Sequence, residues 1–439
     1  MLAYPKNIIF DYKRYKLYNQ FMNKLPDGWE IKKLKDILSN EKYSIKRGPF
    51  GSSLKKEFFI KEGVKVFEQY NPINNDPHWC RYRIDKKKYE ELKAFSCRAG
   101  DFLISCSGTL GKILLLPDNV EEGIINQALL KIRLNNKLVD NYYFLNLFQY
   151  EDFQKRIYID AVGSAIHNIA SVNILKEMDV IIPPLDEQKR IASALSKIDA
   201  YLENTIKLIE EKERFKRGIA KKLLTCKEGE NIPEARFKGF NDDWRKEKLS
   251  SMIKIQGGYA FKSSEFKKSG IPIIRISNIS NTDNNMNMKE VVYYNEIENE
   301  KSFIIKKSDL LIALSGAPGK SSIYNLEEKA YLNQRVGLFK IIDTKKINNS
   351  FLSQYVFSSI FQNKLKPFIT RGVQPNISPK DIENLDILLP SLKEQEKIGG
   401  YLSLLDAEID NLKKQKELIK EMKRGAMQKL LSGEVKLLE

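Results

Sequence analysis

The sequence contains only two histidines, His78 and His167, among its 439 residues. Nucleophilic triads and histidine-rich metal sites both depend on imidazole, which transfers protons and binds metals near neutral pH. The scarcity argues against both kinds of site. We therefore expect no catalytic residue and no metal site in this chain, and we expect the two histidines to be ordinary surface or core residues.

Cysteine and long apolar runs are also sparse. Cys80, Cys97, Cys106 and Cys226 are scattered without a C-x-x-C pair, so neither a zinc knuckle nor a disulfide framework is indicated. Apolar stretches such as residues 113–116 fall far below the ~20 residues that a membrane-spanning helix needs. The apolar run near the N-terminus is too short for a signal peptide. We expect a cytoplasmic protein without a membrane segment.

Nucleotide-binding and methyl-donor motifs are missing as well. "SGTLGKI" and "SGAPGKSS" have two residues between their glycines (Gly108 to Gly111, Gly316 to Gly319), whereas a Walker A loop has four. A tight turn after a buried strand is the better interpretation. "DGWEIK" lacks the separate upstream acid of a nuclease core, and no N/D-P-P-Y/F motif occurs. Any transfer chemistry must therefore belong to a partner.

What the sequence has in excess is positive charge. Lys and Arg number 74 against 57 Asp and Glu, a net charge of +17, and the pI is near 9.3. The excess is spread along the chain, which indicates a broad phosphate-facing surface rather than a basic tail. A solvated surface or a lysine-rich proteome would also explain it. The length suits two or more domains.

A long internal repeat organises the chain. "IIPPLDEQKRIASALSKIDA" begins at Ile181, and "ILLPSLKEQEKIGGYLSLLDA" begins at Ile387. With Pro183 aligned to Pro390, roughly 18 of about 43 positions are identical without a gap, far more than shared composition gives. Upstream, "GDFLISCSGTLGK" (100–112) resembles "SDLLIALSGAPGK" (308–320), and "INQALLKI" (125–132) resembles "LNQRVGLFK" (332–340). The chain is an internal duplication.

Each repeat ends in a long helix. Apolar residues recur at spacings of three and four with Lys and Glu between them, which is the stripe of a coiled coil. About 40 residues at ~1.5 Å each give rods of roughly 60 Å. The Glu-Gln pairs are explained either by capping and solvation or by contact with a helix or partner. The packing candidates are Glu187, Gln188, Ile191, Leu195, Ile198, Leu202, Glu394, Gln395, Ile398, Leu402, Leu405 and Ile409.

The halves before the helices contain short β-rich runs broken by Gly and Asn turns, with a few helices such as 141–157 and 350–365. Basic, amide and aromatic residues cluster in them. Arg pairs with guanine edges and Asn or Gln with adenine, while Lys mainly meets phosphate. The DNA-binding candidates are Lys46, Arg47, Tyr70, Asn71, Arg81, Arg83, Lys112, Tyr259, Arg275, Asn278, Lys320, Arg335, Arg371, Gln374 and Asn376.

Several motifs, in this order and twice over, resemble the DNA-specificity subunit of a Type I restriction–modification enzyme. They are the D-x-W starts at 27–34 and 242–249, "PEARFKGFNDDW" (233–244), the two S-G-x-x-G-K turns and the two P-x-L-x-E-Q-x-x-I helix starts. The resemblance covers the chain from about residue 22 onward. The first 21 residues have no counterpart in it.

The resemblance implies an α+β fold: two duplicated α/β target-recognition domains, separated by two long antiparallel helices that form a coiled coil with pseudo-twofold symmetry. It divides the chain into an N-terminal extension (1–21), a first recognition domain (22–183), a central spacer helix (184–226), a second recognition domain (227–390) and a C-terminal spacer helix (391–433).

The function implied by the resemblance is non-catalytic. The subunit binds a bipartite, asymmetric site on double-stranded DNA, one half per domain. It recruits two adenine-methyltransferase subunits, and endonuclease/translocase subunits complete the complex. The resemblance places S-adenosylmethionine in the methyltransferase partner, with no cofactor in this chain. Two alternatives are a structural coiled-coil scaffold and a recognition fragment of a fused DNA methyltransferase.

Overall fold

A computed structural model describes residues 25–160, 167–279, 286–297, 302–369 and 375–437. The chain divides into two compact units, each described by itself. The first unit consists of two segments of the chain, one that ends at Asn204 and one that begins at Lys416. The second comprises Thr205–Gln415.

The first unit is built on two four-stranded sheets, in the orders β2-β9-β6-β7 and β4-β3-β8-β5, with β1 paired to β12 and β10 to β11. The pair β3·β8 is parallel and its neighbours are antiparallel. The strands are β1 Glu30–Lys33, β2 Ile45–Arg47, β3 Val64–Phe67, β4 Tyr82–Ile84, β5 Ser96–Cys97, β6 Phe102–Ser105, β7 Ile113–Leu115, β8 Gly123–Ile125, β9 Leu129–Ile132, β10 Tyr158–Asp160, β11 His167–Ile169 and β12 Asp179–Ile182.

The second unit repeats this topology. Its sheets have the orders β14-β21-β18-β19 and β16-β15-β20-β17, β13 pairs with β22, and β15·β20 is again the parallel pair. The strands are β13 Arg245–Lys248, β14 Ile253–Gly257, β15 Ile271–Ile274, β16 Val292–Tyr294, β17 Ile304–Ile305, β18 Leu310–Ala313, β19 Ser321–Ile323, β20 Ala330–Leu332, β21 Val336–Ile341 and β22 Asp386–Leu389. The matching strand orders confirm the predicted duplication.

Helices flank these sheets. The expected helices over 141–157 and 350–365 are each two helices, because Tyr150 and Ser358 adopt extended backbone conformations between them. In both cases a new helix begins at the next residue. The shorter helices are α2 Tyr70–Asn74, α3 Lys86–Glu91, α4 Asn141–Gln149, α5 Glu151–Ile157, α6 Val172–Lys176, α8 Asn349–Phe357, α9 Ser359–Leu365 and α10 Pro379–Glu383.

Strands β6 and β18 are buried along their whole length. A strand covered on both faces needs consecutive apolar residues, since successive side chains point to opposite faces. Accordingly Phe102 and Ile104 enter one hydrophobic cluster of the first unit and Leu103 enters another. In the second unit the neighbouring residues Leu310 and Leu311 likewise belong to two different hydrophobic clusters. The apolar runs that predicted buried strands therefore supply two packed layers per domain.

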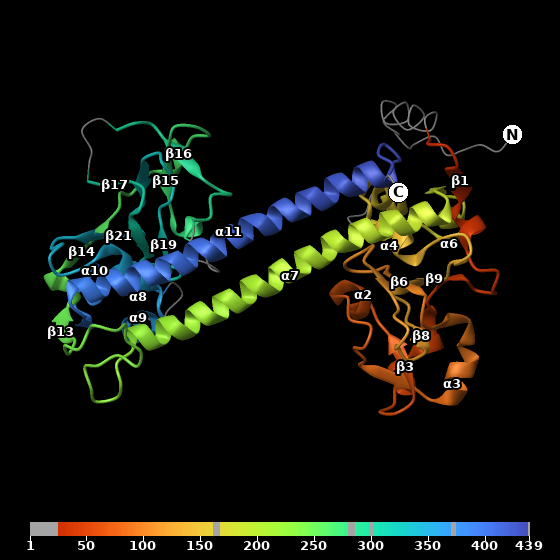
Figure 1. Cartoon of the computed structure of the whole chain (residues 1–439), viewed down its shortest axis with the longest axis horizontal. Coiled ribbons are helices and arrows are strands. Elements are labelled where there is room, and N and C mark those ends of the chain that lie inside the picture. Colours follow the sequence, from red (N-terminus) through yellow and green to blue (C-terminus); the bar gives the residue numbers. More distant parts are fainter. Residues whose placement is uncertain (1–24, 161–166, 280–285, 298–301, 370–374, 438–439) are drawn as a thin grey trace. The chain divides into compact units, whose positions relative to one another are not determined.

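Two long helices, α7 (Leu185–Leu224) and α11 (Leu392–Leu431), have 40 residues each and are the long yellow-green and blue ribbons in Figure 1. They begin and end at equivalent positions of the repeat. Gly433, with a φ of +78°, follows α11, and a Cβ there would lie 2.7 Å from Cδ of Pro26. Glycine thus permits both the helix stop and the close approach.

Ion pairs join α7 to α11. In the second unit Lys212 pairs with Glu408 and Lys216 with Asp406, so that later positions of α7 meet earlier positions of α11. Lys413 also reaches Glu213 there. The helices are therefore antiparallel, as predicted. Among the described residues, no helix is both long enough and apolar enough to cross a membrane.

Candidate nucleic-acid interface

Loops from different strands meet at one edge of the first domain. The amide of Asn126, after β8, donates to the carbonyl of Phe67 at the end of β3 (3.0 Å), and the amide of Cys106, after β6, donates to the carbonyl of Ala128 (2.7 Å). Nη2 of Arg47 donates to the carbonyl of Cys106 at 3.3 Å. The ends of β2, β3 and β6 and the β8–β9 connection are thus joined in one cluster.

The same loops meet in the second domain. The amide of Asn333 donates to the carbonyl of Ile274 (3.0 Å), that of Leu314 to the carbonyl of Arg335 (2.9 Å), and that of Gln334 to the carbonyl of Tyr259 (2.9 Å). Two candidates from separate strands, Tyr259 and Arg335, are thereby placed in one loop cluster, and both side chains are exposed.

Glycine is required where β2 and β14 enter these clusters. A Cβ at Gly48 would lie 1.8 Å from the carbonyl oxygen of Asn126, and one at Gly258 would lie 2.1 Å from that of Leu332. No real Cβ contact is this short, so any larger residue would push the loops apart. The two glycines define structurally equivalent positions in the two domains.

The S-G-x-x-G-K segments are tight turns after β6 and β18. Gly108 and Gly111 have φ of +65° and +70°, and the Ser105 hydroxyl closes the turn by donating to the carbonyl of Thr109 (2.6 Å) and accepting from the amide of Lys112 (3.0 Å). The Lys112 side chain is exposed at the end of this turn.

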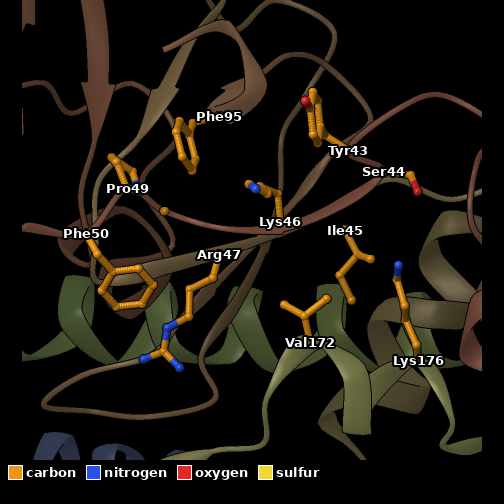
Figure 2. Close-up of a pocket in the computed structure, with 11 residues that line it drawn as sticks. Tyr43, Ser44, Ile45, Lys46, Arg47, Pro49, Phe50, Phe95, Val172 and Lys176 are labelled. Carbon is orange, nitrogen blue, oxygen red and sulfur yellow. The ribbon is translucent and has the colours of Figure 1, made fainter. Parts of the chain in front are cut away.

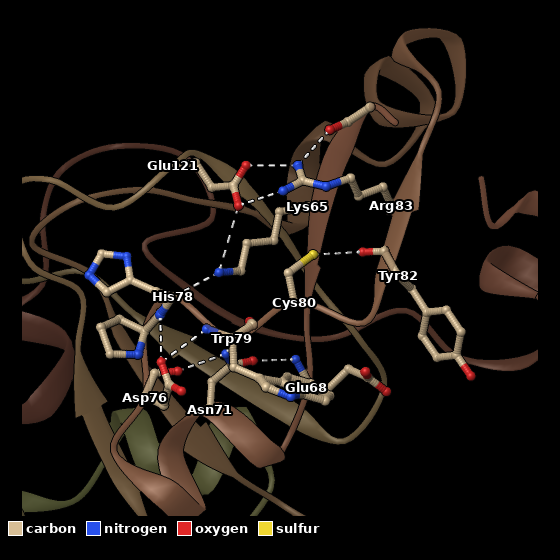
Figure 3. Close-up of polar contacts among 12 residues, drawn as sticks. Lys65, Glu68, Asn71, Asp76, His78, Trp79, Cys80, Tyr82, Arg83 and Glu121 are labelled. Atoms are coloured by element: carbon tan, nitrogen blue, oxygen red, sulfur yellow. Dashed lines mark hydrogen bonds and ion pairs between the residues drawn. The ribbon is translucent and has the colours of Figure 1, made fainter. Parts of the chain in front are cut away.

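Two candidate asparagines are buried. The side-chain oxygen of Asn71 accepts from the amide of Glu68, and its NH₂ group donates to the carbonyls of Asp76 and Trp79 (2.9 and 2.8 Å) (Figure 3). Asn278, the equivalent residue, accepts from the amide of Arg275 and donates to the carbonyl of Asn287 (2.9 Å). Both amides hold a loop in shape.

A buried lysine supports the loop around Asn71. Lys65 is fully buried, and its Nζ donates to the carbonyl of Pro77 (2.7 Å) and lies 3.8 Å from Oε1 of Glu121 (Figure 3). Burial lowers the pKa of this ammonium group, although the charge of Glu121 opposes the shift. The loop presents an aromatic pair, because the exposed Tyr70 stacks on the half-buried Trp79 with ring centroids 4.2 Å apart. Sequence reasoning missed Trp79, which no motif marks.

The candidate arginines have different surroundings. Arg83 is bound through two nitrogens to the Glu121 carboxylate (2.8 and 2.9 Å), and this bonding raises its pKa and lowers that of Glu121. Arg81 is exposed and lies over the Tyr82 ring. Arg275 lies over the Phe266 ring. Arg371 and Gln374 lie outside the described residues, and Asn376 forms a backbone bridge with Ser315 of the β18 turn.

The two Gln residues at the helix starts attach each long helix to its own domain. Oε1 of Gln188 accepts from the amide of Asp140 (2.9 Å), and Nε2 donates to the carbonyls of Leu138 and Pro183 (3.0 and 2.8 Å). Gln395 makes the equivalent three bonds, to residues 348, 346 and 390. Both side chains are completely buried.

The neighbouring glutamates are also buried but have different partners. Glu187 accepts a hydrogen bond from Nε1 of Trp29 (3.0 Å), whereas Glu394 accepts two from Arg236 (2.8 Å each). The apolar packing candidates behave alike: Ile191, Leu195 and Ile198 join the core of the first unit, and Ile398, Leu402 and Leu405 join that of the second. Leu202 is half-buried, and Ile409 is buried.

Gln188→Leu should destabilise the first unit by about 2–3 kcal/mol, because it leaves a buried amide and two carbonyls without partners. Hydrogen exchange of β6 and β9 is the measurement, with exposed Lys189→Leu as the matched control, expected within about 0.5 kcal/mol of the parent. Unchanged protection in the Gln188→Leu protein would contradict the attachment.

Comparison with known proteins agrees with this architecture. The Type I restriction modification DNA specificity domain matches residues 26–211 and again residues 241–421. The chain therefore belongs to the family of Type I restriction–modification DNA specificity subunits. It is a specificity subunit and is not itself a catalytic component.

Curated relatives match most of the chain. The Type I restriction enzyme MjaVIII specificity subunit of Methanocaldococcus jannaschii is 30% identical over 72% of this chain and 75% of its own length. The putative MjaX specificity subunit of the same organism is 26% identical over 97% and 98%. The crystal structure of the Type I S subunit from M. genitalium has the same fold, with a TM-score of 0.55 at 19% identity, over 93% of this chain and 97% of that one.

Proposed function

We propose that the two domains read the two halves of one bipartite, asymmetric site on double-stranded DNA. The observation that supports this most directly is the pair of equivalent loop clusters with different side chains. Glu68 and Arg275 stand at the same position, since the amide of each donates to the buried Asn three residues later. Pro49 and Tyr259 likewise follow the equivalent glycines. One scaffold carrying unlike residues suits unlike half-sites.

The candidates that the structure does not assign to holding a loop remain our candidates for DNA contact, together with Arg371 and Gln374, which lie outside the described residues. We assign base edges to Arg81, Arg275, Arg335, Arg371, Gln374 and Asn376, and stacking or sugar contacts to Tyr70 and Tyr259. Lys46, Arg47, Lys112 and Lys320 are assigned to phosphates. Asn71 and Asn278 hold the loops, and Arg83 contacts DNA only if its ion pair with Glu121 opens.

We also propose that the long helices carry the catalytic partners. Tyr201, Leu208 and Phe215 lie seven residues apart on α7 and are exposed, as are Leu404 and Leu418 on α11 (70% and 64%). A heptad-spaced exposed apolar stripe is the surface that a partner helix covers. Two methyltransferase subunits, which would supply the S-adenosylmethionine site, and endonuclease/translocase subunits are the proposed partners, in the cytoplasm.

The domain limits remain part of this proposal: recognition domains at 22–183 and 227–390, spacer helices at 184–226 and 391–433, and an N-terminal extension at 1–21. Within it, the antiparallel helices act as a ruler between the half-sites.

The purified chain should transfer no methyl group from S-adenosylmethionine to DNA, because the reaction belongs to the partner. Adding the methyltransferase subunit should produce methylation at one bipartite sequence. Methyl transfer by the chain alone, free of partner, would overturn the non-catalytic assignment. DNA binding by the assembled complex without sequence preference would instead favour a scaffold.

A further inference from the structure

A hollow of about 420 Å³ lies beside strand β2 of the first domain (Figure 2). It is bordered by β2, by the turn after it and by helix α6. The lining residues are Tyr43, Ser44, Ile45, Lys46, Arg47, Gly48, Pro49, Phe50, Phe95, Val172 and Lys176. Three of them are cations and none is an acid.

Aromatic rings hold two of these cations. Nζ of Lys46 lies 5.2 Å from the ring centre of Tyr43 and 5.3 Å from that of Phe95. The Arg47 guanidinium lies 5.8 Å from the ring centre of Phe50. Its Nε is buried and has no hydrogen-bond partner, an arrangement that costs free energy unless a ligand compensates it.

Strand β2 also directs backbone amides toward the edge of the sheet at which the hollow lies. β2 is an edge strand, and among the described strands it pairs with β9 alone. The amide of Gly48 donates to Leu129 and that of Arg133 donates to Ser44, so positions 44, 46 and 48 face β9. Because hydrogen-bonding direction alternates along an antiparallel strand, the N–H groups of Ile45 and Arg47 point out of the sheet, toward its open edge.

The second domain has a carboxylate at the corresponding place. The amide of Ile255 in edge strand β14 is equivalent to that of Ile45, and it donates to Oε1 of Glu383 at 2.8 Å. Glu383 ends α10, as Lys176 ends α6, and in both cases the capping serine lies five residues before the last residue of the helix. The second domain therefore supplies its own anion at this edge, where the first domain has a lysine.

We propose that the hollow binds a phosphate group of the DNA backbone beside the first half-site, through Lys46, Arg47, Lys176 and the outward amides of β2. Glu383 shows that the fold accepts an oxyanion at this place. In the second domain Glu383 fills the site, and there is no equivalent of Lys46 or Arg47, since Gln256 and Gly257 stand in their places. This inference rests on the proposed function. It predicts that the contribution of the first domain to DNA affinity depends more strongly on salt concentration than that of the second domain.

The Lys176→Glu substitution tests the site, because it gives the first domain the carboxylate that Glu383 supplies at the equivalent position of the second domain. DNA binding by the complex of this chain with its methyltransferase subunit is measured against salt concentration, on DNA carrying the methylated sequence. We expect about a tenfold loss of affinity at low salt and a slope of log K against log [salt] shallower by about 0.9, the value for one phosphate contact. The methylated sequence should not change.

Three matched variants separate the possible outcomes. Lys137→Glu makes the same charge change at an exposed position that does not line the hollow, and it should leave the slope unchanged. Lys176→Arg should restore binding, and Glu383→Gln, which keeps an acceptor for Ile255, should have no effect. Equal slopes for Lys176→Glu and Lys137→Glu would overturn the inference while leaving the proposed function intact. Binding of inorganic phosphate in the hollow without any weakening of DNA binding would overturn the inference as well. Absence of sequence-specific DNA binding by the parent complex would instead refute the proposed function.

Discussion

Replacing residues 22–183 with the first domain of a relative should change one half of the methylated sequence and leave the other half unaltered. Each domain has its own hydrophobic clusters and its own loop cluster, so under the proposed function we expect each set of loops to select its bases independently of the other. Methylation at the original sites should disappear, and a hybrid site should replace it. Mapping methylated motifs in cells that carry each chain is the measurement.

The structure indicates how the graft must be made. The first domain packs on Ile191 and Leu195 of α7 and on Met427, Leu430 and Leu431 of α11, so the donor must present a compatible apolar face. Gln188 makes no such demand, because its partners are backbone groups. The matched control is the reciprocal graft of residues 227–390. If either graft altered both half-sites together, the domains would not be separate readers.

Lengthening the helices by one turn should lengthen the unread spacer and leave both half-sites as they are. Four residues add ~6 Å along an α-helix, and DNA rises ~3.4 Å per base pair. An insertion near Lys212 should therefore lengthen the spacer by one to two base pairs. Four residues are close to one turn, so the packing face is roughly retained, with local unwinding of the coiled coil.

Ion pairs define the best position for this insertion. Four residues are inserted directly before Lys212 in α7, and four directly after Lys413 in α11. The ion pairs that Lys212, Glu213 and Lys216 make with α11 then all lie on the same side of the insertions and are preserved. The pair between Asp199 and Lys423 stays on the other side. The single insertion before Lys212 serves as the mismatched control and should methylate less efficiently. An unchanged spacer with altered bases in either half would show that the helices are not the ruler.

The repeat and the long helices could be predicted from the sequence because each leaves a periodic pattern. An apolar stripe every three to four residues specifies a helix that packs on one side, and an ungapped repeat specifies equivalent ends for α7 and α11. The attachments could not be predicted in the same way. The repeat marks Gln188 and Gln395, but only the fold shows that each binds a nearby proline carbonyl together with an amide and a carbonyl from a distant part of the chain.

The candidate interface could be predicted only as a set of residue types. Asn71 was an adenine-reading candidate by its chemistry, yet its burial and its three hydrogen bonds give it a loop-holding role. Trp79 follows no motif and becomes a candidate only through its stack on Tyr70. The contrast between Lys176 and Glu383 likewise depends on strand register, which a pattern of short strands does not fix.

We propose that this chain, which is a specificity subunit and not itself catalytic, determines where its partner subunits methylate DNA. Long-read methylation mapping of cells with and without the chain tests it most directly. One bipartite adenine-methylated motif should be present in cells with the chain and completely absent in cells without it, while other modified motifs stay the same. A methylation pattern that is identical in the two kinds of cell, with the methyltransferase partner expressed in both, would contradict it.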